Sequence, residues 1–267
     1  MFEILDHLPP VARVLDLGCQ DGSFAAESYL FQTVRVDLTK GNTSRQIVVA
    51  DAAQLPFRSR IFDAVILNHC LEHFVRLKPS LQEIGRIVKS NGAIFVSVPD
   101  ARTLSDRLYR KVAKKSGGHV NLFDSHDELI KMLAWYFGLP YVGTRTLHSS
   151  LTFLNRRNLK ADPAIRSQMK FNGLCEPLLA LVNAFLRLVD RALGARLSVY
   201  GWGVYFGTVS ERIDPTAMIN VCLRCGKART FAEILGADPH ERHRFWVRYR
   251  CDCGAINIGV SELTMPR

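Results

Sequence analysis

The sequence contains no long run of uncharged hydrophobic residues. The most apolar uncharged run, residues 177–186, has ten residues, whereas a membrane-spanning helix needs about 20. The first ten residues, MFEILDHLPP, carry acidic groups and show neither the basic start nor the apolar centre of a secretory signal peptide. These absences predict a cytoplasmic protein that lives in a reducing compartment and does not span a membrane.

Internal repeats and low-complexity segments are also missing. Of the 267 residues, 48% are hydrophobic and 22% are charged, with 18 glycines and 11 prolines. This mixture excludes wholesale disorder, collagen-like repeats and coiled coil. The length suits one α/β domain of roughly 200 residues with a small additional segment.

Acidic residues are in the minority, since 25 stand against 35 basic residues and the net charge is +10. Residues 1–155 carry net +3 (18 basic, 15 acidic), and residues 156–267 carry net +7 (17 basic, 10 acidic). Such a balance is compatible with nucleic acid, anionic lipid or a phosphorylated substrate and does not choose between them. The C-terminal part supplies most of any attraction to an anionic partner.

Short β-rich runs alternate with helical stretches in the first hundred residues. The helical period is clearest over residues 77–88, and Asn91-Gly92 predicts a turn before the fifth strand. Strands alternating with helices predict a doubly wound, mostly parallel sheet with helices on both faces. The five predicted strands are residues 11–18, 33–38, 46–51, 62–68 and 93–99.

Two helices and two further strands are expected after the fifth strand. The helices cover residues 104–115, ended by Gly117-Gly118, and residues 127–137, capped by Ser125. Residues 141–154 and 200–209 predict an antiparallel pair at one sheet edge, which brings the sheet to seven strands. We expect one domain over residues 1–212, with a helical insertion at about 156–198, and a small segment over 213–267.

Polar residues follow four successive strands. Gly18 and Gly22 permit a sharp turn after the first strand, where a Cβ would block close approach of a ligand. Asp37 ends the second strand, and a carboxylate there can accept both hydroxyls of a ribose. Asp51-Ala52 and Asn68-His69 end the third and fourth strands. Taken singly, each is equally explained by a turn or a helix cap, but their ordered recurrence predicts a nucleotide site at one sheet edge.

The ordered set resembles the class I S-adenosylmethionine-dependent methyltransferases, in particular their small-molecule branch. The motifs that carry the likeness are VLDLGCQDG, VRVDL, VADAAQLPF, FDAVILNHCLEHF and LQEIGRIVKSNGAIFVSVP. The resemblance implies a Rossmann-like sheet and S-adenosylmethionine as cofactor. The cofactor-binding residues that it implies are Asp16 and Gly18 at the methionine part, with Gly22 in the same loop, Asp37 and Leu38 at the ribose, Asp51 and Ala52 at the adenine, and Asn68 near the sulfonium.

One position departs from the family pattern, because Gln20 stands where glycine is common. A side chain at this position can alter the methionine pocket, so a catalytically degenerate scaffold protein remains an alternative. The alternative hypothesis, a nicotinamide-dependent dehydrogenase, explains fewer of the motifs. The loop lacks the third glycine of GxGxxG, and that family gives no reason for LNHCLEHF.

Histidines near the predicted site are the candidate general bases. An acceptor hydroxyl or ammonium needs a base with a pKa near 7, which suits histidine. His69 follows the fourth strand, His73 lies one turn on, and His119 follows a Gly-Gly hinge. Taken alone, a histidine at such a position is more often structural or simply exposed than catalytic. We expect His119 and His69 to be catalytic, with His119 as base or substrate ligand.

The insertion contains an amphipathic helix with one large aliphatic face. Two interpretations remain open: a helix packed on the domain, or an apolar lid or interfacial helix for a lipid-linked substrate at an anionic membrane surface. The apolar face consists of Leu178, Leu181, Val182, Phe185, Val189 and Leu193.

Four of the seven cysteines form two close pairs near the C-terminus, Cys222/Cys225 and Cys251/Cys253. Two such pairs supply the tetrahedral thiolate set that zinc prefers in closed structural sites. Disulfides are the alternative, which a reducing compartment disfavours. The sequence predicts a structural zinc ribbon. Basic and aromatic residues around it can bind RNA, but the alternation in RFWVRYRC also fits an ordinary strand.

The leading hypothesis is methyl transfer from S-adenosylmethionine to an O or N atom of a small or lipid/glycan-linked metabolite. The second hypothesis is RNA methylation with the ribbon as the RNA-binding part, and the third is the degenerate scaffold. Loops and insertions build acceptor pockets, so the acceptor leaves no motif.

Overall fold

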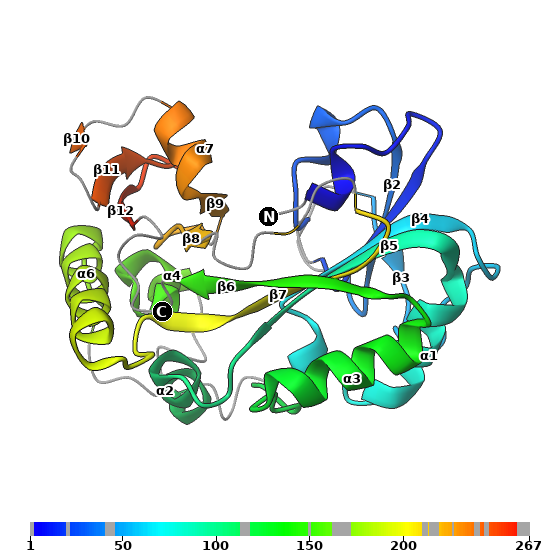
Figure 1. The fold of residues 1–267 in the computed structure, drawn as a ribbon, viewed down its shortest axis with the longest axis horizontal. Helices are drawn as coiled ribbons and strands as arrows, with labels where there is room; N and C mark the ends of the chain where they lie inside the picture. Colours follow the sequence, from blue (N-terminus) through cyan, green and yellow to red (C-terminus); the bar gives the residue numbers. More distant parts are fainter. Residues whose placement is uncertain are drawn as a thin grey trace.

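The computed structural model describes residues 3–19, 22–40, 46–112, 118–148, 151–161, 172–209, 213, 219–225, 227–237, 241–242 and 246–260. Figure 1 shows one large sheet that runs through the molecule, with a smaller sheet above α6. The strands are β1 (Arg13–Leu17), β2 (Gln32–Asp37), β3 (Val48–Val49), β4 (Phe62–Asn68), β5 (Val88–Pro99), β6 (Tyr141–His148), β7 (Val199–Gly207), β8 (Ile219–Val221), β9 (Ala228–Thr230), β10 (Glu241–Arg242), β11 (Trp246–Arg250) and β12 (Ile256–Val260).

The helices that the structure describes are α1 (Leu77–Ile87), α2 (Leu104–Val112), α3 (His126–Phe137), α4 (Arg156–Ala161), α6 (Glu176–Leu193) and α7 (Phe231–Gly236). The described residues also form four short 3-10 turns. The turns are η1 (Glu3–Leu5), η2 (Ala26–Ser28), η3 (Leu71–His73) and η4 (Thr152–Leu154). None of the helices that the structure describes is both long and apolar enough to cross a membrane.

The large sheet has the strand order β3-β2-β1-β4-β5-β7-β6-β8-β9. Strands β1 to β5 pair in parallel, and β7 lies antiparallel between β5 and β6. The mostly parallel sheet and the antiparallel β6/β7 pair are therefore confirmed. Two short strands, β8 and β9, extend the seven expected strands to nine because they pair onto the outer edge of β6, which would otherwise present unpaired backbone groups. Residues 213–267 thus contribute to both sheets.

The two faces of the large sheet are covered in different ways. Helices α1 and α3 lie together on one face (Figure 1) and pack Leu81, Ile84 and Leu133 against Leu15 and Leu67. On the other face, η1 and irregular segments, not long helices, cover the described strands; they contribute residues such as Ile4, Leu5, Phe31 and Ile213. Between β1 and β2 the described chain forms only η2, and its aromatic residues Tyr29 and Phe31 stack 4.8 Å apart.

The turn predicted at Asn91-Gly92 lies instead within β5. Helix α1 ends at Ile87 and β5 starts at Val88. Val88 pairs with Phe62 and Ala93 with Ala64, so four residues of β5 oppose one of β4 and Gly92 falls in this irregularity. The expected helix cap is confirmed, since the Ser125 side chain accepts from the Glu128 backbone N–H at 3.4 Å.

The smaller sheet has the order β10-β11-β12 and packs with α7 around a core of two cysteines and a few apolar residues. In β11, Val247 and Tyr249 are buried while Arg250 is exposed, as the alternation in the sequence indicates. Helix α6 confirms the predicted helix in the insertion, and it lies against β12. The helix expected at residues 104–115 is α2, and residues 113–115 lie outside the described residues. Gln20 also lies outside them.

Candidate functional site

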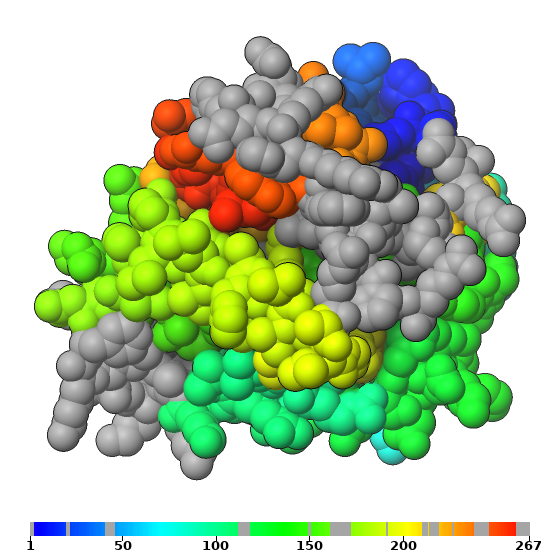
Figure 2. Space-filling model, turned by 60° about the vertical axis from the view of Figure 1, so that its left-hand side comes forward, coloured from blue at the N-terminus to red at the C-terminus, as the bar shows by residue number. Residues whose placement is uncertain are grey.

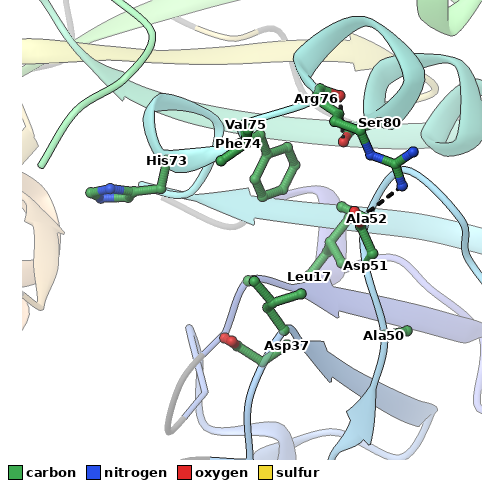
Figure 3. Close-up of a pocket in the computed structure, with 12 residues that line it drawn as sticks. Leu17, Asp37, Ala50, Asp51, Ala52, His73, Phe74, Val75, Arg76 and Ser80 are labelled. Carbon is green, nitrogen blue, oxygen red and sulfur yellow. Dashed lines mark hydrogen bonds and ion pairs between the residues drawn. The ribbon is translucent and has the colours of Figure 1, made fainter. Parts of the chain in front are cut away.

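A cleft of about 500 Å³ lies at the edge where β1, β2 and β3 end (Figure 3). This is the crevice in which open parallel α/β sheets bind ligands. It is lined by Leu17, Gly18, Asp37, Leu38, Ala50, Asp51, Ala52, His73, Phe74, Val75, Arg76 and Ser80. Five of the eight predicted cofactor-binding residues line it, namely Gly18, Asp37, Leu38, Asp51 and Ala52.

The floor of the cleft at β1 requires glycine. Gly18 has φ +67°, and a Cβ built there would lie 2.5 Å from the Cβ of Cys70. Its N–H donates to the Val36 carbonyl at 2.8 Å, which fixes the chain against β2. Any L side chain at residue 18 is therefore both strained and in steric conflict.

The rest of the loop after β1 is shaped from inside the protein. Asp16 is fully buried, and one of its carboxylate oxygens accepts from the Ser23 backbone N–H at 2.8 Å. Gly22 has φ +108° and donates to the Cys19 carbonyl at 2.6 Å. Neither residue lines the cleft, so both act on it through the loop backbone.

Two carboxylates face the cleft from the ends of β2 and β3 (Figure 3). Asp37 accepts from the Thr39 N–H at 3.3 Å. Asp51 accepts from the Ala53 N–H at 2.8 Å and pairs with Arg76 at 2.9 Å. The Ala53 N–H and then the Arg76 guanidinium lower the pKa of the Asp51 carboxyl, so it is ionised at neutral pH.

The opposite wall was missed in the sequence. Phe74, Val75, Arg76 and Ser80 come from the end of η3 and the start of α1 and stand across from the two carboxylates. The one indication of these residues in the sequence is that they follow Leu-Glu-His at residues 71–73. Asn68, in contrast, does not line the cleft, because its side-chain oxygen accepts from the Ser97 hydroxyl at 2.8 Å.

A second cavity of about 450 Å³ adjoins the first and shares His73 with it. In Figure 3 the His73 ring points away from the two carboxylates. The sequence predicts three of the lining residues as candidates and misses the others. The cavity is lined by His69, Glu72, His73, Ser105, Tyr109, His119, Thr152, Phe153 and Tyr200.

His119 is held from two sides in this second cavity. Its Nδ1 lies 2.6 Å from an oxygen of the buried Asp106, whose other oxygen accepts from Arg110 at 2.5 Å. The next two backbone N–H groups donate to the Glu72 carbonyl at 2.8 and 3.0 Å. A carboxylate only accepts, so Nδ1 carries the proton and Nε2 of the neutral ring is left as an acceptor.

His69 and Glu72 also line the second cavity. His69 has φ +53°, an uncommon value for a residue other than glycine, and its ring lies 4.9 Å from that of Tyr200. Glu72 is buried, and its Oε2 has no hydrogen-bond partner in the described part of the chain. Ligand atoms of Glu72, His73 and His119 lie within 4.8 Å of one another. The cavity thus offers acceptor atoms for a proton or a cation.

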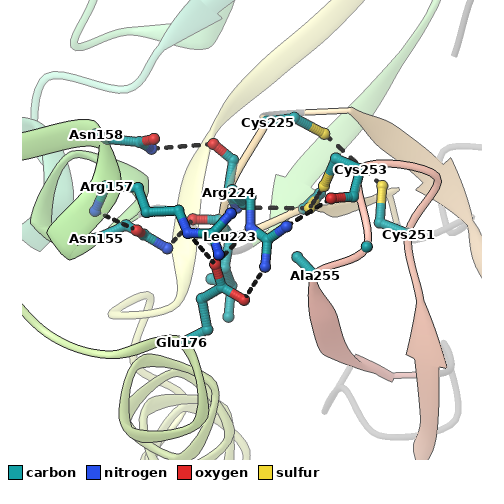
Figure 4. Close-up of polar contacts among 12 residues, drawn as sticks. Asn155, Arg157, Asn158, Glu176, Leu223, Arg224, Cys225, Cys251, Cys253 and Ala255 are labelled. Carbon is teal, nitrogen blue, oxygen red and sulfur yellow. Dashed lines mark hydrogen bonds and ion pairs between the residues drawn. The ribbon is translucent and has the colours of Figure 1, made fainter. Parts of the chain in front are cut away.

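The four predicted zinc ligands converge on one point between the two sheets (Figure 4). Their Sγ atoms all lie within 4.8 Å of one another, and the Cys222–Cys253 and Cys225–Cys251 distances are both 3.7 Å. A disulfide needs about 2.05 Å, so the thiols are free. Sulfurs bound at about 2.3 Å to one tetrahedral zinc ion stand about 3.8 Å apart.

A comparison with known protein families gives the family of the chain. A family model described as "Methyltransferase domain" matches residues 2–141, which is more than half of the chain. The chain belongs to this methyltransferase-domain family, which confirms the resemblance seen in the motifs.

Two curated relatives differ in what they methylate. The chain is 29% identical over 164 residues to malonyl-[acyl-carrier protein] O-methyltransferase of Legionella pneumophila (55% of this chain, 58% of that protein). It is 27% identical over 125 residues to tRNA (carboxymethyluridine(34)-5-O)-methyltransferase of Arabidopsis thaliana (43% and 31%). The chain spans 58–66% of the length of the first curated relatives that it matches.

Among solved structures, a S-adenosylmethionine-dependent methyltransferase from Archaeoglobus fulgidus superposes with a TM-score of 0.48 at 18% identity. The superposition covers 74% of this chain and 86% of that one.

Proposed function

We propose that this protein transfers a methyl group from S-adenosylmethionine to an O or N atom of a small or lipid/glycan-linked acceptor. The observation that carries the proposal is the pair of adjoining cavities with His73 as their common wall. One cavity has the carboxylates and apolar surface that a nucleoside needs, and the other has the histidines that a proton transfer needs.

The first cleft fits the cofactor. The Asp37 carboxylate accepts hydrogen bonds from the ribose hydroxyls, and Leu38, Ala52 and Phe74 supply apolar surface for the adenine. The Asp51 carboxylate accepts a hydrogen bond from the exocyclic amino group of the adenine. Asp16 and Gly22 fix the loop after β1, and Asn68 fixes the end of β4; none of the three lines the cleft. S-adenosylmethionine supplies an electrophilic methyl group on a positively charged sulfur; the protein supplies alignment of the acceptor, which can lower the barrier by several kcal/mol.

The second cavity holds the acceptor. His119 removes the proton from the acceptor atom through Nε2, and Asp106 fixes the ring and stabilises its charged form. His69, which lines the same cavity, contacts the acceptor. A positioned general base contributes roughly 10²- to 10⁴-fold to a rate.

The cysteine cluster holds one structural zinc ion. Four thiolate ligands leave no open coordination position, so this metal stabilises the fold and takes no part in the reaction. The Asn257 amide and the Arg224 N–H donate to Cys222 Sγ at 3.4 and 3.5 Å, the outer contacts expected around a thiolate ligand. In a ribbon with so small a core, metal binding supplies much of the folding free energy.

RNA is the second candidate acceptor, because one relative is a tRNA methyltransferase. The charged side chains of the ribbon favour an RNA acceptor less than a small or lipid-linked one. Arg224 pairs with Glu176 at 2.5 Å, and Lys227 and Arg229 both pair with Asp252. Cations that are already paired attract phosphate weakly.

Radiolabelled methyl transfer to three separate pools, a lipid extract, a small-metabolite extract and total tRNA, tests the proposal. We expect label in the lipid or the metabolite pool and its loss in His119→Ala. Label in tRNA alone would overturn the acceptor class. Cofactor binding with no label in any pool would favour the scaffold.

A further inference from the structure

Helix α6 is turned so that its polar face lies inside the protein. Asn183 and Asp190 are 4% and 1% exposed, whereas Leu181 and Phe185 are each 62% exposed. The helix does pack on the domain, by a face that combines these polar residues with Leu179 and Ala180, and most of the predicted apolar face stays outside.

Buried polar contacts fix this orientation. Asp190 accepts from the backbone N–H groups of Leu197 and Ser198 at 2.6 and 2.7 Å. Arg187 donates to the Ile258 carbonyl of β12 at 3.2 Å. Rotating the helix to bury its leucines would leave these groups without partners inside the protein, which is costly.

The outward face is a continuous apolar stripe. Its members recur with helical spacing along the whole of α6 and are 46–77% exposed. Figure 2 shows α6 facing the viewer across the surface, with α2 below it. Monomeric proteins rarely expose contiguous patches of this kind without a partner. The stripe consists of Leu178, Leu181, Phe185, Leu188 and Leu193.

The exposed charges beside the stripe are cationic. The acidic residues of α2, α6 and the Asp100 turn are Asp100, Asp106, Asp190 and Glu176; the first three are buried, and Glu176 is 17% exposed and paired with Arg224. Several basic residues of the same region are exposed, whereas Arg110 and Arg187 turn inward to Asp106 and the Ile258 carbonyl. The exposed cations that carry the argument are Arg107 and Lys111 in α2 and Arg156 and Lys160 in α4. Arg102 and Arg196 are also exposed but pair with Asp100, and Arg157 pairs with Glu176.

We infer that the α6 stripe and its cationic border dock the protein on an anionic phospholipid surface. Leucine and phenylalanine side chains enter the headgroup region, and lysine and arginine bind the lipid phosphates; this is the arrangement of an interfacial helix. A second copy of the chain would place like charges against each other and is disfavoured.

The docked face leads to the acceptor cavity, and this step rests on the proposed function. Phe153 lines the second cavity and also packs in the cluster formed by Leu179 and Ala180 of α6. Tyr109 of α2 lines the same cavity, 5.5 Å from the Phe153 ring. A lipid-linked acceptor held in the bilayer surface therefore has a short route to His119.

Co-sedimentation of the full chain with vesicles tests the inference. We expect at least tenfold tighter binding to vesicles of phosphatidylcholine with 30% phosphatidylglycerol than to phosphatidylcholine alone. The double variant Leu181→Asp/Phe185→Asp should lose at least tenfold of this affinity. Trp135→Asp, at an 83% exposed residue of α3, is the matched control and should bind as the unmodified protein does.

Calorimetric titration with S-adenosylmethionine checks the fold of each variant and keeps the two proposals separate. Unmodified protein that binds the cofactor but no anionic vesicle overturns the docking surface and leaves the proposed function intact. Equal vesicle binding by the double variant and the control also overturns it. A dimer in light scattering that the double variant dissociates, without vesicle binding, assigns the stripe to a second copy and overturns it as well.

Discussion

The Nδ1 atom of His119 lies 2.6 Å from a carboxylate oxygen of Asp106, and both side chains are almost wholly buried. This pair joins α2 to the segment that precedes α3 and holds His119 in the lining of the second cavity. We expect Asp106→Asn to lower the turnover number about 100-fold, as His119→Ala does. Affinity for S-adenosylmethionine should change less than threefold in both. Transfer of radiolabel measures the rate; unchanged turnover in either variant contradicts the assignment.

The Gly18 backbone sets the floor of the cofactor cleft. Gly18→Ala should lower the free energy of unfolding by about 1–3 kcal/mol, because φ is positive and Cβ meets Cys70. Gly236→Ala is the matched control: its Cβ meets nothing within 4 Å, and helix propensity predicts no loss of stability. Urea unfolding compares them, and equal effects would show that the loop tolerates a side chain.

After the Ala53 N–H, the Arg76 guanidinium is the second contact that lowers the pKa of the Asp51 carboxyl. Because that contact lowers the Asp51 pKa, we expect cofactor affinity to stay constant from pH 8 down to about pH 5. In Arg76→Ala the fall in affinity should begin at higher pH, since the carboxyl loses one of its two lowering contacts. Calorimetry across pH measures this. Stability should change by less than about 1 kcal/mol, as the pair is half-exposed.

His148 links stability to pH. Burial, followed by the charges of Arg187 and Arg196, lowers its pKa to about 3, whereas in the unfolded chain the pKa is about 6.5. Below about pH 6.5 the unfolded state binds a proton that the folded state does not, so stability falls as pH falls. Between pH 6.5 and 5 the loss from this group is about 2 kcal/mol. His148→Leu should remove that part of the pH dependence in urea titrations, and an unchanged slope contradicts it.

The cysteine cluster should bind one zinc ion per chain, measurable by elemental analysis. Chelation should lower the melting temperature and increase the number of thiols that react with a chromogenic disulfide by four. Cys222→Ser should lose the metal, whereas Cys175→Ser, at an exposed cysteine outside the cluster, should keep it. Zinc-free protein with unchanged melting would contradict a structural metal.

The cofactor cleft could be predicted from the sequence because parallel strands bring their carboxyl ends to one edge, so Gly18, Asp37 and Asp51 meet wherever their strands pair. Asn68 sits at a strand end as well, yet its amide turns to Ser97 on the neighbouring strand, a contact that spacing along the chain does not reveal.

The second cavity and the orientation of α6 could not be predicted in this way. Phe153, Tyr109 and Tyr200 come from three separate elements that only the tertiary fold brings together. The hydrophobic pattern of α6 indicates which face is apolar but not which face is buried, because the partners of Asp190 and Arg187 lie in distant or irregular segments.

Calorimetric titration of the full chain with S-adenosylmethionine tests the central claim most directly. The account predicts one bound molecule per chain, with affinity at least tenfold weaker in Asp37→Ala and unchanged in Trp135→Ala. No binding by the unmodified protein, or equal affinity in Asp37→Ala, would contradict it.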